Sequence, residues 1–177
     1  IDNVPIVASL ADAGGVGVAG PPDLMASCAR AILAQIACFH SPSEVATAAV
    51  GSSLPTSGWD WLKWLPHTGS AHSPLTGVSL ADNATTAKNL IAQLEDLYQE
   101  RSSQEKREEP IPLPRVLLVV MDDTPIERSR LVRLAELGPS VGINILWCAS
   151  SISQIPAACR SFIELDEAGN GESGQVH

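Results

Sequence analysis

The chain has 177 residues, of which 45% are hydrophobic and 18% are charged. This composition supports one folded domain with a hydrophobic core and excludes a disordered acidic chain. The net charge of −9 argues against nucleic-acid binding, because most of that affinity comes from lysine and arginine side chains that neutralise phosphates.

The cysteines give no sign of a metal site. They show no C-x-x-C pairing and no histidine at ligand spacing, which argues against zinc. We expect all four to be free thiols, buried in a protein of a reducing compartment: Cys28, Cys38, Cys148 and Cys159. No segment reaches the roughly 18 apolar residues of a membrane-spanning helix. Because the chain begins at Ile1 and not at methionine, we expect a piece cut from a larger membrane protein.

The first half of the chain predicts two strands and two helices. A short apolar strand over Val16–Ala19 precedes a helix over Asp23–Phe39, in which apolar residues recur every three or four positions. The sequence VATAAV from Val45 predicts a second buried strand. Farther on, Asp82 or Asn83 is expected to cap the second helix. That helix has an apolar stripe formed by Ala87, Leu90, Ile91, Leu94, Leu97 and Tyr98.

The second half alternates in the same way. The charged tract from Arg101 to Pro114 predicts a mobile surface connection. After it, the expected elements are a strand from Arg115, a helix over 126–137, a strand over 143–149 and a strand over 161–165.

Strand–helix alternation with continuous apolar strands predicts an α/β fold, a mostly parallel sheet covered by helices. We expect a single domain over residues 1–166, followed by a flexible tail over 167–177.

The turn after the first strand has the layout of a phosphate-binding loop without its lysine. Aligned on Gly20, the loop motif G-x-x-x-x-G-K-S/T places Ala26 at the lysine position and Ser27 at the hydroxyl position. Ser27 therefore keeps the one side chain of the motif that can contact a metal ion.

Three neighbouring residues also work against phosphate binding. Pro21 and Pro22 remove two backbone N–H donors, and Asp23 adds a negative charge where an anion would lie. Proline and aspartate are also favoured in the first turn of a helix, so a plain strand-to-helix turn explains the same residues. We favour that interpretation.

The run LLVVMDD ends in two aspartates at the expected carboxyl end of a strand, where parallel sheets bind ligands. Asp122, with the Ser27 hydroxyl, is the candidate magnesium ligand. Asp123 is the candidate catalytic carboxylate, placed to polarise an attacking water. Aspartates that end strands are also common turn and N-cap residues, so both interpretations stay open.

Polar residues follow the strand over 143–149 as well. Ser150, Ser151 and Gln154 are candidates for sensing a terminal phosphate, although turn formation by serines is the favoured explanation. The complete set of nucleotide-pocket-like positions is Gly20, Pro21, Pro22, Asp23, Ser27, Asp122, Asp123 and Ser150.

The segment WDWLKWLPH holds three of the four tryptophans. In a helical turn, Trp61, Trp64 and Leu65 share one face. The favoured interpretation is a lid that packs these rings onto the sheet. The alternative is a partner-docking surface, because tryptophan is enriched in the energetic centres of interfaces. Either role involves four side chains of this segment, namely Trp59, Trp61, Trp64 and His67.

Three pieces of the sequence, in this order, carry a family resemblance: ARAILAQIACFHSPSEV, GWDWLKWLPHTGSAHSP, and PRVLLVVMDD followed by GPSVGINILW. With them the chain resembles the EccC family of FtsK/SpoIIIE-type ATPases of actinobacterial type VII (ESX) secretion. WDWLKWLPH is the most specific piece, and the resemblance spans most of residues 14–165. More narrowly, the chain is similar to the domain between the membrane helices and the first intact ATPase domain.

The resemblance implies a P-loop NTPase-like (RecA/FtsK-like) fold with a degenerate Walker A motif. It implies a place at the cytoplasmic face of the membrane, at the base of a motor that exports small, paired helical proteins at the expense of ATP. In intact domains of the family a lysine binds phosphate and an aspartate binds magnesium; the matching positions here are Ala26 and Asp122. We therefore expect a domain without hydrolytic activity that couples the membrane region to active ATPase domains, with no tightly bound cofactor and at most weak binding of ATP and magnesium.

The implied partners are other domains of the same ATPase and membrane components of the secretion complex, with a hexamer in the full assembly and a monomer for this piece alone. One alternative is a slow magnesium-dependent ATPase that uses Ser27, Asp122 and Asp123. Another is a DNA-translocating motor domain, which the acidic charge disfavours.

Overall fold

The computed structural model describes residues 14–56, 58–104, 113–166 and 175–176. Strands and helices alternate along the chain, with three short 3₁₀ helices (η) between them. In order they are β1 (Gly15–Ala19), α1 (Pro22–Phe39), β2 (Val45–Val50), η1 (Asp60–Trp64), β3 (Leu80–Ala81), α2 (Ala84–Gln104), β4 (Arg115–Val120), α3 (Arg128–Leu137), η2 (Gly138–Val141), β5 (Ile143–Ala149), η3 (Ile152–Gln154), β6 (Ser161–Glu164) and β7 (Gln175–Val176).

The strands form one sheet in the order β3-β2-β4-β5-β1-β6-β7. The first six run parallel, and β7 pairs antiparallel with β6. The predicted α/β fold with a mostly parallel sheet is confirmed. The sequence did not predict β3 or β7, which have two residues each. Of the expected tail, only Gln175 and Val176 are among the described residues.

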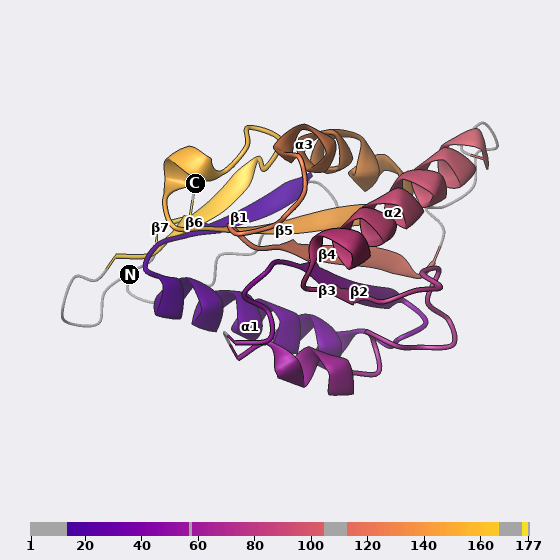
Figure 1. Cartoon of the computed structure of the whole chain (residues 1–177), viewed down its shortest axis with the longest axis horizontal. Helices are drawn as coiled ribbons and strands as arrows, with labels where there is room; N and C mark the ends of the chain where they lie inside the picture. Colours follow the sequence, from indigo (N-terminus) through magenta and orange to yellow (C-terminus); the bar gives the residue numbers. More distant parts are fainter. Residues whose placement is uncertain (1–13, 57, 105–112, 167–174, 177) are drawn as a thin grey trace.

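Helices cover both faces of the sheet, with α1 on one side and α2 and α3 on the other (Figure 1). Side chains of β4 alternate between the two layers, because successive residues of a strand point to opposite faces. Toward α2 and α3 lie Val116, Leu118 and Val120. Toward α1 lie Leu117 and Val119, followed by Met121. Burial on both faces explains the continuous apolar strand sequences.

The end of α2 corrects a sequence expectation. Residues 101–104 belong to this helix and not to a mobile connection, and residues 105–112 lie outside the described residues. Arg101 is only 6% exposed. Its guanidinium donates hydrogen bonds to the carbonyl oxygens of Val141 (3.0 Å) and Pro114 (2.8 Å). Burial lowers the pKa of Arg101, and the nearby charge of Glu100 partly opposes this shift.

The cysteines are free, as expected, but not all of them are buried. Cys148 and Cys159 are buried, Cys28 is half-buried, and Cys38 is exposed near the end of α1. The expectation for Cys38 was wrong because this residue lies on the outer side of the helix. Among the described residues, no helix combines the length and apolar character needed to cross a membrane.

Candidate functional site

The predicted site residues gather at one edge of the sheet. Asp122, Ser150 and Gly20 follow β4, β5 and β1, which are neighbours in that order. Because parallel strands end at the same edge, all three residues lie at their carboxyl ends, the usual ligand side of such sheets. The strand ends thus bring these three candidates to one edge of the sheet.

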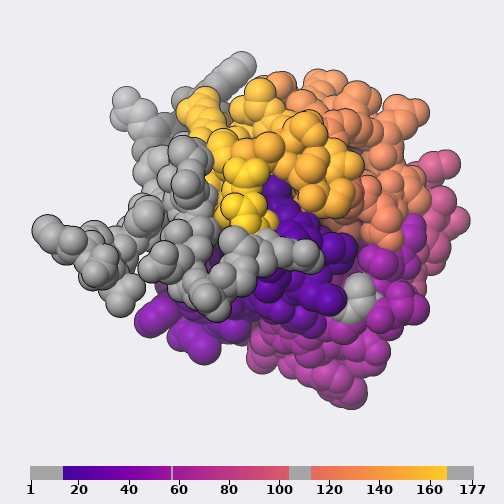
Figure 2. Space-filling view, turned by 90° about the vertical axis from the view of Figure 1, so that its left-hand side faces the viewer, coloured from indigo at the N-terminus to yellow at the C-terminus, as the bar shows by residue number. Residues whose placement is uncertain are grey.

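Gly20 makes the turn between β1 and α1. Its φ of +146° is a conformation that residues with a side chain rarely adopt, and its N–H donates to the Ala149 carbonyl oxygen (3.2 Å). A Cβ added to Gly20 would lie 2.4 Å from the carbonyl oxygen of Leu165. The chain after β6 therefore closes directly onto this turn. Figure 2 looks at this end of the molecule, where the yellow C-terminal segment lies against the indigo N-terminal one.

The helix begins at once after this turn. α1 starts at Pro22, so only Gly20 and Pro21 separate it from β1. The Met25 N–H already donates to the Pro21 carbonyl oxygen (2.9 Å) as part of the helix. The first four N–H positions of an α-helix have no partner within it, and here two of the four are prolines. Asp23 and Leu24 alone supply free N–H groups at this helix end.

Ser27 lies one turn into α1. Its hydroxyl donates to the carbonyl oxygen of Asp23 (2.7 Å) and accepts a long hydrogen bond from Arg30 (3.4 Å). Both partners belong to the same helix. The Ser27 hydroxyl is thus engaged locally, as serines in helices commonly are.

Asp122 is tied to the end of β5. Its Oδ2 accepts hydrogen bonds from the Ser150 hydroxyl (2.8 Å) and the Ser150 N–H (3.3 Å). The same hydroxyl lies 2.7 Å from Oε1 of Gln154, which also accepts the N–H of Ser151 (3.1 Å). A hydroxyl carries one proton, so it donates to either Asp122 or Gln154 at a given moment. Gln154 and Ser151 form a capping box at the start of η3, which supports the turn interpretation for these residues.

Asp123 lies on the side of β2, the other strand that pairs with β4. A Cβ added to Gly51, just after β2, would lie 3.0 Å from Oδ1 of Asp123. The Ser52 hydroxyl donates to the Asp123 carbonyl oxygen (3.0 Å). Asp122 therefore contacts the end of β5, whereas Asp123 lies beside the end of β2. In the described part of the chain, no three histidine, cysteine, aspartate or glutamate residues are grouped as a metal site.

The tryptophan-rich segment packs beside α1 and covers the edge of β2. Trp59 is buried and Trp61 is half-buried in the core layer on the α1 side. Trp64 is 80% exposed, with the Lys63 ammonium 5.6 Å from its ring centre. The Thr47 N–H of β2 donates to the carbonyl oxygen of His67 (2.9 Å). Trp64 does not share the buried side of Trp61, contrary to the helical-face expectation, because η1 packs through Leu62 and leaves Trp64 on the solvent side.

His67 is a buried structural residue of this segment, only 4% exposed. Its Nε2 lies 2.8 Å from the carbonyl oxygen of His40, at the end of α1. A carbonyl can only accept, so Nε2 carries the proton in this hydrogen bond. Nδ1 of His67 and the indole nitrogens of Trp59 and Trp61 are buried polar atoms without a hydrogen-bond partner.

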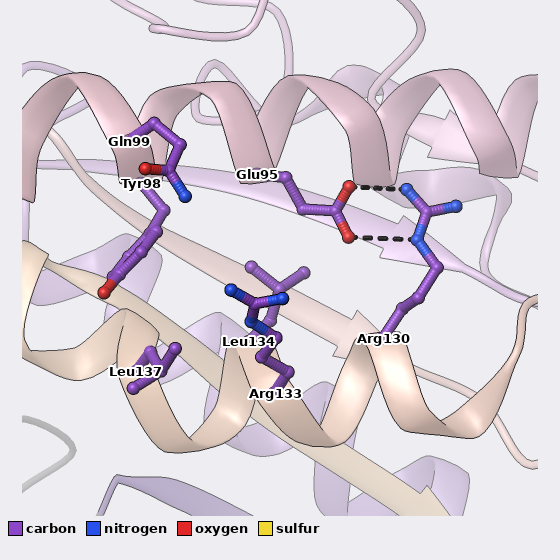
Figure 3. Close-up of a pocket in the computed structure, with 7 residues that line it drawn as sticks. All are labelled: Glu95, Tyr98, Gln99, Arg130, Arg133, Leu134 and Leu137. Carbon is purple, nitrogen blue, oxygen red and sulfur yellow. Dashed lines mark hydrogen bonds and ion pairs between the residues drawn. The ribbon is translucent and has the colours of Figure 1, made fainter.

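A groove between α2 and α3 escaped the sequence analysis (Figure 3). Its volume is about 210 Å³. Arg130 donates to Glu95 through Nε (2.9 Å) and Nη2 (2.6 Å), which joins the two helices. This hydrogen bonding raises the pKa of Arg130. The other lining residues are Tyr98, Gln99, Arg133, Leu134 and Leu137. The apolar stripe of α2 was visible in the sequence, but the pairing of Glu95 with Arg130 was not.

No protein-family model matches the chain. An ESX secretion system protein EccC from Geobacillus thermodenitrificans is 25% identical over 160 residues, which are 90% of this chain and 11% of that protein. The ESX-4 secretion system protein EccC4 of Mycobacterium tuberculosis is 40% identical over 67 residues, which are 38% of this chain and 5% of that protein. The chain thus spans at most about a tenth of the length of these relatives.

Among solved structures, the cytoplasmic domain of the Thermomonospora curvata type VII secretion ATPase EccC matches with a TM-score of 0.67 and 23% identity, over 86% of this chain and 20% of that one. This likeness shows that the two proteins share the same α/β fold. In sequence, the chain is similar to EccC proteins of ESX secretion systems, and in fold it is similar to this cytoplasmic domain.

Proposed function

We propose that the chain is a domain of a type VII secretion motor that does not hydrolyse ATP. It acts by contact, coupling the membrane region of the motor to active ATPase domains during protein export. Its partners are other domains of the same protein and membrane components of the secretion complex, at the cytoplasmic face of the membrane. In the full assembly the domain is one of six copies.

One observation carries the non-hydrolytic role, namely the immediate start of α1 after Gly20 and Pro21. A phosphate-binding loop holds its ligand with successive backbone N–H groups and a lysine. Here the residues from Pro22 onward, which would form such a loop, already belong to α1, and Ala26 is at the lysine position. The chain after β6 also closes onto Gly20. These residues do not fit a triphosphate, so no step of hydrolysis is assigned to them.

Its place in the motor is supported by the relatives, which are named as ESX secretion proteins. We place the domain between the membrane helices and the first intact ATPase domain on the WDWLKWLPH segment. Contact-based coupling suits a domain whose helices cover both faces of a rigid parallel sheet.

A slow magnesium-dependent ATPase is the competing function, and the position of Asp122 favours it. The carboxylate lies at the ligand edge of the sheet and contacts Ser150, where a nucleotide-binding domain would hold magnesium. The two functions differ in whether Asp122 matters for nucleotide binding.

Thermal unfolding with 10 mM ATP and magnesium separates them. A site with a Kd of about 100 μM would add about 2.7 kcal/mol of stability under these conditions. We expect no stabilisation beyond that given by magnesium and sodium sulfate at equal ionic strength. An increase with ATP that disappears in Asp122→Asn would show that this carboxylate takes part in nucleotide binding. Release of inorganic phosphate by the same protein, absent in Asp122→Asn, would then establish the ATPase function and overturn the proposal.

A further inference from the structure

The groove between α2 and α3 carries one positive charge that its own carboxylate does not neutralise. Both oxygens of Glu95 accept hydrogen bonds from the guanidinium of Arg130, so these two residues neutralise each other. Arg133, one turn farther along α3, also lines the groove, but it has no hydrogen bond or ion pair with any described residue. The lining residues therefore have a net charge of +1, in a chain whose net charge is −9.

Three side chains with hydrogen-bond donors extend into this groove from the two helices (Figure 3). The Arg133 guanidinium points from α3 toward α2, and the Gln99 amide points from α2 toward α3. The Tyr98 hydroxyl also points toward α3. Within the described part of the chain, neither the Gln99 amide nor the Tyr98 hydroxyl has a hydrogen-bond partner. An arginine with amide and hydroxyl donors beside it matches the acceptor oxygens of a carboxylate.

The rest of the groove is apolar and short. Leu134 is buried, and Leu137 is 38% exposed. The Glu95–Arg130 pair crosses from helix to helix at one end, and Tyr98 reaches toward Leu137 at the other (Figure 3). The volume of about 210 Å³ is below the roughly 300–1,000 Å³ of sites for drug-sized ligands. The groove thus suits a ligand about the size of one amino acid, and not a chain that continues past both ends.

We propose that this groove binds a small carboxylic acid with a short apolar group. The carboxylate accepts hydrogen bonds from the Arg133 guanidinium, whose planar set of donors can hold both oxygens. The apolar group lies against Leu134 and Leu137. Neither Asp122 nor Gly20, at the strand ends, lines this groove, so the inference goes beyond the proposed function.

Titration of the whole, isotopically labelled chain with N-acetyl-leucine, followed by amide chemical shifts, tests this inference. We expect saturable shift changes in residues 95–99 and 130–137, with a Kd of about 1 mM for a molecule of this size. N-acetyl-leucinamide has the same apolar group without the charge, and acetate has the charge without the apolar group. Each should bind at least about tenfold more weakly than N-acetyl-leucine.

Two arginine variants place the charge that holds the ligand. Arg133→Gln keeps a side chain with hydrogen-bond donors but removes the charge, and should raise the Kd of N-acetyl-leucine at least about tenfold. Arg160→Gln is the matched control, because it removes the same charge from an exposed arginine that does not line the groove. It should leave the Kd unchanged. The amide spectra of both variants also show whether they are folded.

Absence of saturable binding up to about 10 mM N-acetyl-leucine overturns the inference. So does acetate that binds as well as N-acetyl-leucine, which would indicate an ion held by a surface arginine only. Equal weakening by the two arginine variants also overturns it. A peptide, acetyl-alanyl-alanyl-leucine, ends in the same group: if it binds at least about tenfold more tightly than N-acetyl-leucine, the groove takes the end of a polypeptide chain instead. No nucleotide enters these titrations, so their results are independent of the proposed function.

Discussion

Asp122 and Asp123 are adjacent in the sequence, but their carboxylates lie beside the ends of different strands. Asp122 accepts the hydroxyl of Ser150 after β5, and Asp123 lies beside Gly51 after β2. The acidic pair is thus divided between β5 and β2, the two strands that flank β4. A magnesium ligand and a water-polarising carboxylate would have to act on one small ligand, so this division bears directly on the competing ATPase function.

Gly20 should be the most sensitive residue of the β1–α1 turn. Gly20→Ala puts a Cβ on a residue with φ of +146° and drives it against the carbonyl of Leu165. We expect a loss of about 2–4 kcal/mol in the free energy of unfolding, from backbone strain and steric overlap. Urea denaturation followed by circular dichroism measures it.

Gly69→Ala is the control for this prediction. A Cβ at Gly69 meets no atom within 4 Å, so the substitution should change stability by less than about 0.5 kcal/mol. Equal effects of the two substitutions would show that the Leu165 contact does not constrain the turn.

Arg101 should be a major stabilising residue at the opposite edge of the sheet. Arg101→Met keeps the long side chain but leaves the carbonyl oxygens of Val141 and Pro114 without their donor. We expect a loss of about 2–4 kcal/mol, since both bonds come from a charged, buried group. Chemical denaturation of Arg133→Met, at an exposed arginine, provides the comparison and should give a change below about 0.5 kcal/mol.

The sequence was sufficient to predict most strands of the sheet, but it did not predict the burial of Arg101. Strands buried on both faces need apolar residues at every position, and RVLLVV and INILWCA show that directly. The burial of Arg101 depends instead on acceptors 13 and 40 residues farther along the chain. The residues next to Arg101 in the sequence do not show that these acceptors lie beside it in the folded chain.

The candidate site was only partly predictable, because some of its features follow from the strand pattern and others depend on contacts between distant parts of the chain. Parallel topology alone brings Gly20, Asp122 and Ser150 to the carboxyl ends of the strands, so this common edge followed from the predicted fold. That they are neighbours along it depends on the order of β4, β5 and β1, which the sequence did not predict. The direction of each side chain did not follow from the predicted fold either, because it depends on the facing strand ends. The contact of Leu165 with Gly20 was equally hidden, since it joins residues at opposite ends of the domain.

Buried thiols should make the protein less stable in alkaline solution. Burial raises the pKa of Cys148 from 9.0 to about 12 and that of Cys159 to about 11. Above pH 9 the unfolded chain releases these protons while the folded chain keeps them. The unfolded state then binds fewer protons, and the free energy of unfolding falls by about 1.4 kcal/mol per pH unit for each thiol.

Cys148→Ala tests this thiol separately from other groups that titrate above pH 9. Between pH 9 and pH 11, the slope of unfolding free energy against pH should be shallower in this variant, by about 1.4 kcal/mol per unit. Cys38→Ala removes an exposed thiol and should reproduce the original slope. An unchanged slope in Cys148→Ala would show that the buried thiol ionises as freely in the folded chain as in the unfolded one.

The buried hydroxyl pair of Thr47 and Thr68 should hold the tryptophan-rich segment against β2. The two oxygens lie 2.9 Å apart, and the residues are only 3% and 7% exposed. Thr47→Val keeps the shape of the side chain but leaves the Thr68 hydroxyl unpaired, and should cost about 1–3 kcal/mol. Thr68→Val should cost a similar amount.

The double variant removes both hydroxyls and leaves neither unsatisfied, so its loss should be smaller than the sum of the two single losses by about 1 kcal/mol or more. Denaturation of the four proteins gives this difference directly. If the two losses simply add, the hydroxyls do not interact, and the hydrogen bond from Thr47 N–H to the His67 carbonyl, which all four proteins keep, holds the segment in place.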